Sequence, residues 1–129
     1  MSEKSMKKEF HMEIDDLVDA LLQNINSHGW NLGRMQYELG TLTAAQSEKV
    51  LDDGKAVPVK FELMATWQDF GDALELEVVV KDPEHDWTDG CCAQKCATII
   101  DSIEDKKSYE NLYSENTDFV FDDLESNNN

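Results

Sequence analysis

The feature that most constrains this fold is an alternation of apolar and polar residues over positions 57–81. Every second residue from Val57 to Trp67 is apolar, and so is every second residue from Leu74 to Val80. A period of two places the apolar side chains on one face of a strand. Residues 69–72 between the two runs have the composition of a turn. The pattern predicts an antiparallel hairpin, with strands 57–67 and 73–81, one apolar face and one solvent-facing side.

The same pattern predicts the register of the hairpin. Pairing Gln68 with Ala73 leaves a loop of four residues and places every inward-facing side chain opposite another one, as a correct register requires. On the outer face this register places Met64 opposite Glu77. Pro58, near the start of the first strand, indicates a sheet edge or a strand end, because proline has no amide to donate to a neighbouring strand.

Two stretches have the apolar spacing of an amphipathic helix. The first covers about 8–27, and Gly29 just beyond it has the position of a C-terminal cap. The second covers about 90–105, where Cys92 and Cys96 continue the stripe of isoleucines that follows. The stripe of the first helix consists of Phe10, Ile14, Leu17, Val18, Leu21, Leu22 and Ile25.

Residues 30–54 allow two interpretations. Met35, Tyr37 and Leu39 alternate with polar residues, which favours a strand followed by a short helix over 44–52 that ends at Gly54. The alternative is a single helix through residues 32–42, in which each of two glycines would cost about 1 kcal/mol relative to alanine. We favour the strand and short helix.

The expected fold class is therefore α+β with two layers. A three-stranded, mainly antiparallel sheet is covered on one face by the two helices. The single domain covers residues 1–108, and residues 109–129 form an acidic, aromatic-containing tail that is expected to be partly disordered. A chain of 129 residues is long enough to bury a core without a metal or a disulfide.

The charge of this chain is its most unusual property. The formal net charge is −17, and segments 11–30, 71–90 and 111–129 carry most of it. Direct binding to nucleic acid or to an anionic membrane is not expected, because both rely on clustered lysine and arginine and the sequence has a single arginine, Arg34. A basic partner is favoured by long-range attraction. Acidity that only keeps the protein soluble is the competing explanation.

The location follows from absent signals. The sequence has no apolar stretch of about 18 residues and no apolar segment of a signal peptide near its start. Its three closely spaced cysteines do not resemble a disulfide framework. We expect a cytoplasmic protein.

No residue pattern indicates catalysis, and we expect neither an enzyme nor a cofactor or metal. Cys91, Cys92 and Cys96 lack the second ligand pair of a zinc site, and two of them lie on the apolar stripe of a helix. Nearby acids would raise a thiol pKa, which works against a cysteine nucleophile. The loop that begins at Asp82 resembles a calcium-binding loop at three positions, but it lacks the glycine and the final glutamate.

The acidic segments are the best candidates for a binding surface. Glu75 and Glu77 lie two residues apart on one strand face, hence about 6.6–6.8 Å apart, close to two phosphate steps of a nucleic-acid strand. Trp87 could anchor a partner, and the tail mixes aromatic and acidic residues. The predicted partner-binding residues are Glu75, Glu77, Asp82, Glu84, Asp86, Trp87, Asp89, Asp118, Phe119, Phe121, Asp122 and Asp123.

Two functions are compatible with this surface. The first is an inhibitor or regulator that occupies the basic surface of a nucleic-acid-handling protein by mimicking a polyanion, as small acidic anti-defence proteins of mobile elements do. That comparison rests on size and charge. The alternative is an adaptor or secretion-type chaperone that binds an extended client through the sheet face and Phe119 and Phe121 of the tail. Exposed Met64 and Val79 also make a homodimer possible.

Overall fold

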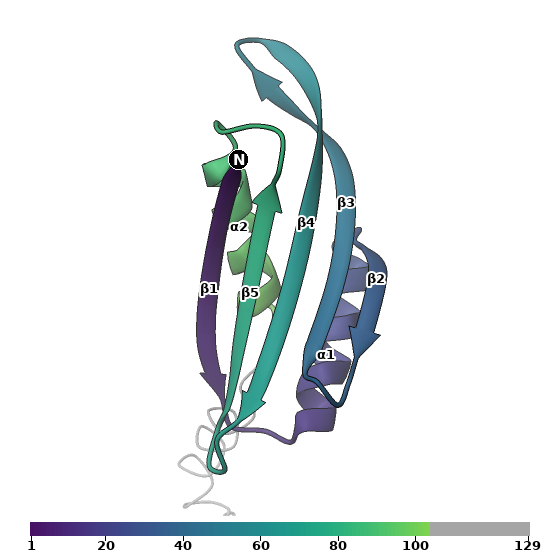
Figure 1. Ribbon diagram of the computed structural model, residues 1–129, viewed down its shortest axis with the longest axis vertical. Helices are drawn as coiled ribbons and strands as arrows, with labels where there is room; N and C mark the ends of the chain where they lie inside the picture. The colour runs from purple at the N-terminus through teal and green to yellow at the C-terminus, as the bar shows by residue number, and fades with distance from the viewer. Residues whose placement is uncertain (104–129) are drawn as a thin grey trace, which may run out of the picture.

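A computed structural model describes residues 1–103 as one antiparallel sheet with two helices on the same face (Figure 1). The sheet order is β1-β5-β4-β3-β2, and every neighbouring pair is antiparallel. The elements are β1 (Ser2–Phe10), α1 (Ile14–Ser27), β2 (Asn31–Gln36), β3 (Thr41–Asp52), β4 (Lys55–Asp69), β5 (Leu74–Asp82) and α2 (Asp89–Asp101).

The α+β class, the antiparallel sheet and the two covering helices are confirmed, but the predicted number of strands is wrong. Residues 1–103 form five strands, not three. Strands β2 to β5 follow one another as a meander. α1 connects the two edges of the sheet, so that β1 pairs with β5 and completes it.

The first missed strand is β1. The first helix was expected from about residue 8, with Phe10 on its apolar stripe, but Ser2–Phe10 pair with β5 along their whole length, and α1 begins only at Ile14. As an edge strand, β1 carries three exposed lysines and is buried only at Ser2 and Phe10. Charged edge strands resist pairing with other chains, and they show little hydrophobic alternation.

The second missed strand is β3, which replaces the predicted helix over 44–52. Asp52 pairs with Lys55 across a two-residue turn, in which Asp53 and Gly54 both have positive φ, 53° and 79°. An Asp-Gly pair between two strands is the preferred sequence for this tight hairpin turn, because its two residues tolerate the left-handed conformation. The signal was therefore present in the sequence, where Gly54 was interpreted as a helix stop.

The β4–β5 hairpin forms as predicted, but its register differs by two residues. Gln68 pairs with Glu75 rather than with Ala73. Asp69 extends the strand and accepts a hydrogen bond of 2.8 Å from the amide of Gly71, which moves the turn one residue along the chain. A shift of two residues keeps every side chain on its predicted face. It also places Met64 opposite Val79, not opposite Glu77.

The core lies between the sheet and the two helices. It contains the inward-facing residues of β4 and β5, the stripe of α1 and the apolar face of α2, including Cys92 and Cys96. Gly29 follows His28, the C-cap residue of α1, and has a φ of 81°, as expected of a glycine that ends a helix. At Pro58, β4 pairs with β3 but not with β5, within residues 1–103. The predicted edge position of Pro58 is therefore also confirmed.

Candidate functional site: an acidic end and a polar cleft

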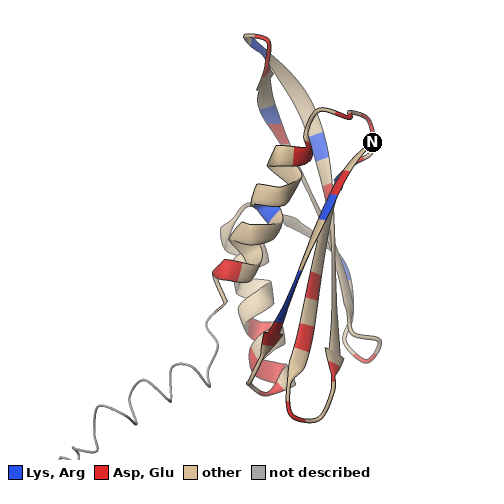
Figure 2. Ribbon diagram, turned by 90° about the vertical axis from the view of Figure 1, so that its left-hand side faces the viewer, with Lys and Arg blue, Asp and Glu red and all other residues tan. Residues whose placement is uncertain are grey.

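At one end of the molecule, carboxylates come together from two segments that are distant in sequence, residues 9–19 and 69–77. They come from the end of β1 and the first turns of α1, from the β4–β5 turn, and from the start of β5 (Figure 2). We call this surface the acidic end. It comprises Glu9, Glu13, Asp15, Asp16, Asp19, Asp69, Asp72, Glu75 and Glu77.

These segments meet at a shared hollow and along the sheet. A hollow of about 350 Å³ is lined by Glu13 from the start of α1 and by Asp69 and Asp72 from the β4–β5 turn. On the sheet, Glu9 lies directly opposite Glu75. Like charges in directly opposed positions destabilise a sheet, so this arrangement does not serve the stability of the fold.

The negative potential of the acidic end reaches the neighbouring β2–β3 turn. Tyr37 of that turn donates a hydrogen bond to the carboxylate of Asp15. This hydrogen bond, with smaller contributions from burial and from the charges of Asp15 and Asp19, raises the pKa of the Tyr37 phenol. Two lysines of β1 border these acids: Lys7 lies opposite Glu77, and Lys8 precedes Glu9 in the chain.

The predicted row of acids along β5 and its following loop does not form one surface. Glu75 and Glu77 belong to the acidic end, whereas Glu84, Asp86 and Asp89 lie at the other end of β5. Asp82 also faces the opposite side of the sheet from the two glutamates, because its position differs from each of theirs by an odd number.

Asp82 is a structural residue of the loop. It is fully buried, and its carboxylate accepts hydrogen bonds from the Glu84 amide (3.0 Å), from Thr88 (2.8 Å) and from His85 (2.9 Å). Burial by itself would raise the pKa of Asp82, but these three hydrogen bonds outweigh it and lower the pKa. A buried carboxylate with these partners is not available to another protein.

The exposed residues of this loop remain candidates for contact. Glu84, Asp86 and Asp89 are exposed, and Trp87 packs its ring edge-on against His85 with 5.2 Å between the ring centroids. They would form a second surface, separate from the acidic end. The other predicted contact residues, Asp118, Phe119, Phe121, Asp122 and Asp123, lie outside the described residues.

The helix-free face of the sheet is open and mixed in charge. Met64 and Val79 lie side by side near its centre and line a hollow of about 540 Å³, and Lys60 and Lys81 stand at its rim. Lys81 pairs with Glu62 at 3.8 Å. This ion pair partly neutralises Glu62 on the open face.

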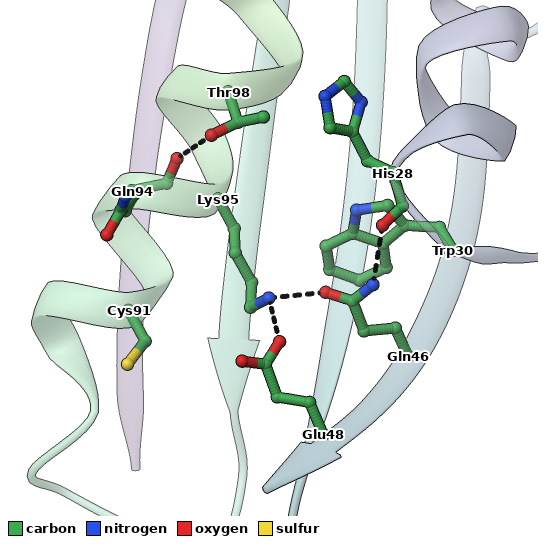
Figure 3. A pocket seen from close by; sticks show the side chains of 8 residues that line it. All are labelled: His28, Trp30, Gln46, Glu48, Cys91, Gln94, Lys95 and Thr98. Carbon is green, nitrogen blue, oxygen red and sulfur yellow. Dashed lines mark hydrogen bonds and ion pairs between the residues drawn. The ribbon is translucent and has the colours of Figure 1, made fainter. Parts of the chain in front are cut away.

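Sequence reasoning missed a polar cleft between the end of α1, the start of β2, strand β3 and helix α2 (Figure 3). Its volume is about 290 Å³. Lys95 of α2 is at its centre, with its ammonium 2.5 Å from Gln46 Oε1 and 2.5 Å from Glu48 Oε1. The lining residues are His28, Trp30, Gln46, Glu48, Cys91, Gln94, Lys95 and Thr98.

Lys95 is held on several sides at once. Its ammonium lies 4.8 Å from the ring centre of Phe61 and 5.8 Å from that of Trp30, and its side chain is 17% exposed. Gln46 also donates to the carbonyl of His28 at 3.0 Å, which links β3 to the end of α1. No sequence signal marks this network, because its members come from four elements and a lone lysine in a helix is usually solvent-facing.

The three cysteines are placed as the apolar stripe predicts. Cys92 and Cys96 are buried, and Cys91 is partly exposed and lines the cleft. Burial raises the pKa of the Cys92 thiol to about 11, with nearby charges such as Asp82 contributing less. Sequence reasoning named the acids as the cause, whereas desolvation is the larger one. At neutral pH this thiol is protonated.

Within residues 1–103, no group of three or more histidine, cysteine, aspartate or glutamate side chains is arranged to hold a metal ion. Neither of the two described helices is long and apolar enough to cross a membrane.

No protein-family model matches this sequence, and no curated protein matches it. Solved structures that are weakly similar in fold include the following two. One is the crystal structure of TTHA0849 from Thermus thermophilus, which is 7% identical, with 78% of this chain and 93% of that chain covered and a TM-score of 0.40. The other is the solution structure of the 18 kDa protein CC1736 from Caulobacter crescentus, which is 11% identical, with coverages of 92% and 97% and a TM-score of 0.38. Both similarities are too weak to assign this chain to a family.

Proposed function

We propose that this protein is a non-enzymatic regulator that binds the basic surface of a nucleic-acid-handling protein through its acidic end. The observation that supports this most is the convergence of carboxylates from two separate segments, residues 9–19 and 69–77, on one end of the fold. A net charge of −17 that served solubility alone would not require such clustering.

The geometry suits a surface that normally binds a phosphate backbone. Glu75 and Glu77 are spaced about 6.6–6.8 Å along one strand, and Glu9 lies across from Glu75 on the neighbouring strand, about 5 Å away. Charges at these spacings, on a rigid sheet, can contact several lysine or arginine side chains of a groove at once. Rigid placement lowers the entropy that is lost on binding.

The negative charge of the acidic end also acts before the two proteins touch. A concentrated negative potential attracts a basic partner over a distance of about a Debye length, roughly 10 Å at 0.1 M salt. Such attraction speeds association and is weakened by salt. Binding through the acidic end should therefore depend strongly on ionic strength.

The test compares two variants that each lose four charges. The first neutralises the acidic end with Glu9→Gln, Asp69→Asn, Asp72→Asn and Glu75→Gln. The matched control neutralises the opposite end with Asp52→Asn, Asp53→Asn, Glu84→Gln and Asp86→Asn, all exposed or partly exposed. Each protein is used for affinity capture from host extract, followed by quantitative mass spectrometry.

We expect the wild type and the control to capture the same basic protein at about 50 mM salt and to release it at about 500 mM, where charges are screened. The acidic-end variant should fail to capture it. Equal capture by both variants, or capture that is independent of salt, would contradict the proposal.

A second candidate function is suggested by the open sheet face. Met64 is 47% exposed next to Val79, in a hollow that could receive an extended segment of a client protein. An adaptor or chaperone of this kind would bind mainly through apolar contacts. Met64→Gln with Val79→Thr should then abolish capture, and the neutralised acidic end should leave it intact.

A further inference from the structure

We propose that the cleft around Lys95 is a binding site for a small neutral molecule with adjacent hydrogen-bond donor and acceptor groups, such as a primary carboxamide. This site is independent of the acidic end. It lies on the helix side of the sheet, between the end of α1 and helix α2 (Figure 3).

Polar side chains reach across the space between the two helices and leave part of it open. Between them β3 carries Gln46 and Glu48, whereas the paired positions of β4 are the apolar Phe61 and Val59. Lys95 reaches from α2 to both polar side chains. About 290 Å³ remains open beside these groups. That volume is just below the usual range of about 300–1,000 Å³ for ligand pockets, so the cleft suits only a small molecule.

The polar atoms of the cleft define the ligand. A lysine ammonium has three donor hydrogens, and Gln46 and Glu48 use two of them. The second oxygen of Glu48 accepts no hydrogen bond within residues 1–103, and Figure 3 shows it turned toward the side of the cleft that holds Cys91. In the described part of the chain, one donor and one acceptor therefore stand side by side for a ligand. A primary carboxamide complements both, with its carbonyl toward Lys95 and its amino group toward Glu48.

The local charge also favours a neutral ligand. The ion pair of Lys95 and Glu48 cancels within the cleft. An anionic ligand would be opposed by the net charge of −17, and a cationic one by the Lys95 ammonium. The aromatic rings of Trp30 and Phe61 lie within about 6 Å of the ammonium and favour a cation at this place.

The competing explanation is that Lys95 only ties α2 to β3. Partly buried ion pairs contribute little net stability, because desolvation offsets their attraction. If Lys95 only links α2 to β3, no small molecule should bind saturably in the cleft. Saturable binding therefore distinguishes the two explanations.

The experiment follows amide resonances of the ¹⁵N-labelled protein during titration with benzamide, and with benzoate and benzamidine as an anion and a cation of similar shape. We expect saturable shifts confined to Gln46–Glu48 and Gln94–Thr98, and at least about tenfold weaker binding of the two charged probes. Lys95→Met should weaken benzamide binding by at least about tenfold, because it removes the donor and retains the stem. Lys60→Met, on the open sheet face, should not change it.

Glu48→Leu provides a second variant at an exposed position, in case Lys95→Met does not fold. It removes the acceptor and should weaken benzamide binding by a similar factor. The proposal is overturned if benzamide causes no saturable shifts, if the charged probes bind equally well, or if a folded Lys95→Met or Glu48→Leu variant binds benzamide like the wild type.

Discussion

Replacing Asp82 with alanine should destabilise the protein strongly, although sequence reasoning placed this residue on a binding surface. The Asp82 carboxylate is the common acceptor for Thr88, His85 and the Glu84 amide, and it fixes the loop between β5 and α2. The loop is also joined to the first strand, because Ser2 donates to the carbonyl of His85 at 3.0 Å and accepts from the amide of Thr88 at 3.1 Å.

The size of the effect follows from the burial of these groups. Thr88 is 1% exposed, so its hydroxyl would lose its acceptor out of reach of water, whereas the other two donors could be partly hydrated. A hydrogen bond to a charged group contributes about 1.5–3 kcal/mol, and an unsatisfied buried donor costs about 1–3 kcal/mol. We therefore expect Asp82→Ala to lower the free energy of unfolding by about 3 kcal/mol and Tm by at least about 10 °C.

Urea unfolding followed by tryptophan fluorescence measures this loss, and Glu84→Ala, an exposed neighbour, is the control that should change stability by less than about 0.5 kcal/mol. If Asp82→Ala unfolded within about 0.5 kcal/mol of the wild type, the structural role assigned to the loop would be wrong.

The pKa of Asp82 adds a prediction of pH dependence. Because its pKa in the folded protein is lower than in the unfolded chain, its charge stabilises the fold fully above the unfolded value, about 4, and this stabilisation is lost as the pH falls through the folded value. The difference in unfolding free energy between the wild type and Asp82→Asn should be constant above about pH 5 and should shrink below about pH 4. A difference that grew with acidification would contradict this assignment.

Other predictions test the fold more widely. Gly40→Ala should destabilise the protein by more than Gly54→Ala in thermal unfolding, because both positions have positive φ but only at Gly40 would the added Cβ lie 2.5 Å from the carbonyl oxygen of Trp67; equal losses would argue against this close approach. In the native protein one thiol, that of Cys91, should react with Ellman's reagent within minutes, and the buried Cys92 and Cys96 should react only after denaturant is added; three fast thiols would contradict the burial described for α2.

The elements that could be predicted from sequence are those with a complete hydrophobic period. The β4–β5 hairpin and both helices pack against the core along most of their length, so the spacing of their apolar residues reflects their burial. β1 could not be found in this way, because an edge strand that is buried only at Ser2 and Phe10 shows almost no alternation of apolar and polar residues. β3 could have been found from Asp53-Gly54, which the helix interpretation of 44–52 overlooked.

The candidate site was only partly accessible to sequence reasoning. Charge totals identified the acidic segments, but where they meet depends on the crossing of α1 from one sheet edge to the other, which no local pattern encodes. The two-residue change in register had a similar effect, since it moved Glu77 away from Met64 and created the apolar centre of the open face. The Lys95 network combines residues separated by 47 and 49 positions, which only the folded chain brings together.

The central claim is that the acidic end occupies a surface that otherwise binds nucleic acid, and a competition experiment tests it most directly. The basic partner isolated by affinity capture is mixed with this protein and with a labelled double-stranded DNA or RNA, and the complexes are resolved by analytical ultracentrifugation. We predict mutually exclusive binding, in which this protein displaces the nucleic acid from its partner and the variant with the neutralised acidic end does not. A stable ternary complex of all three components would contradict the claim.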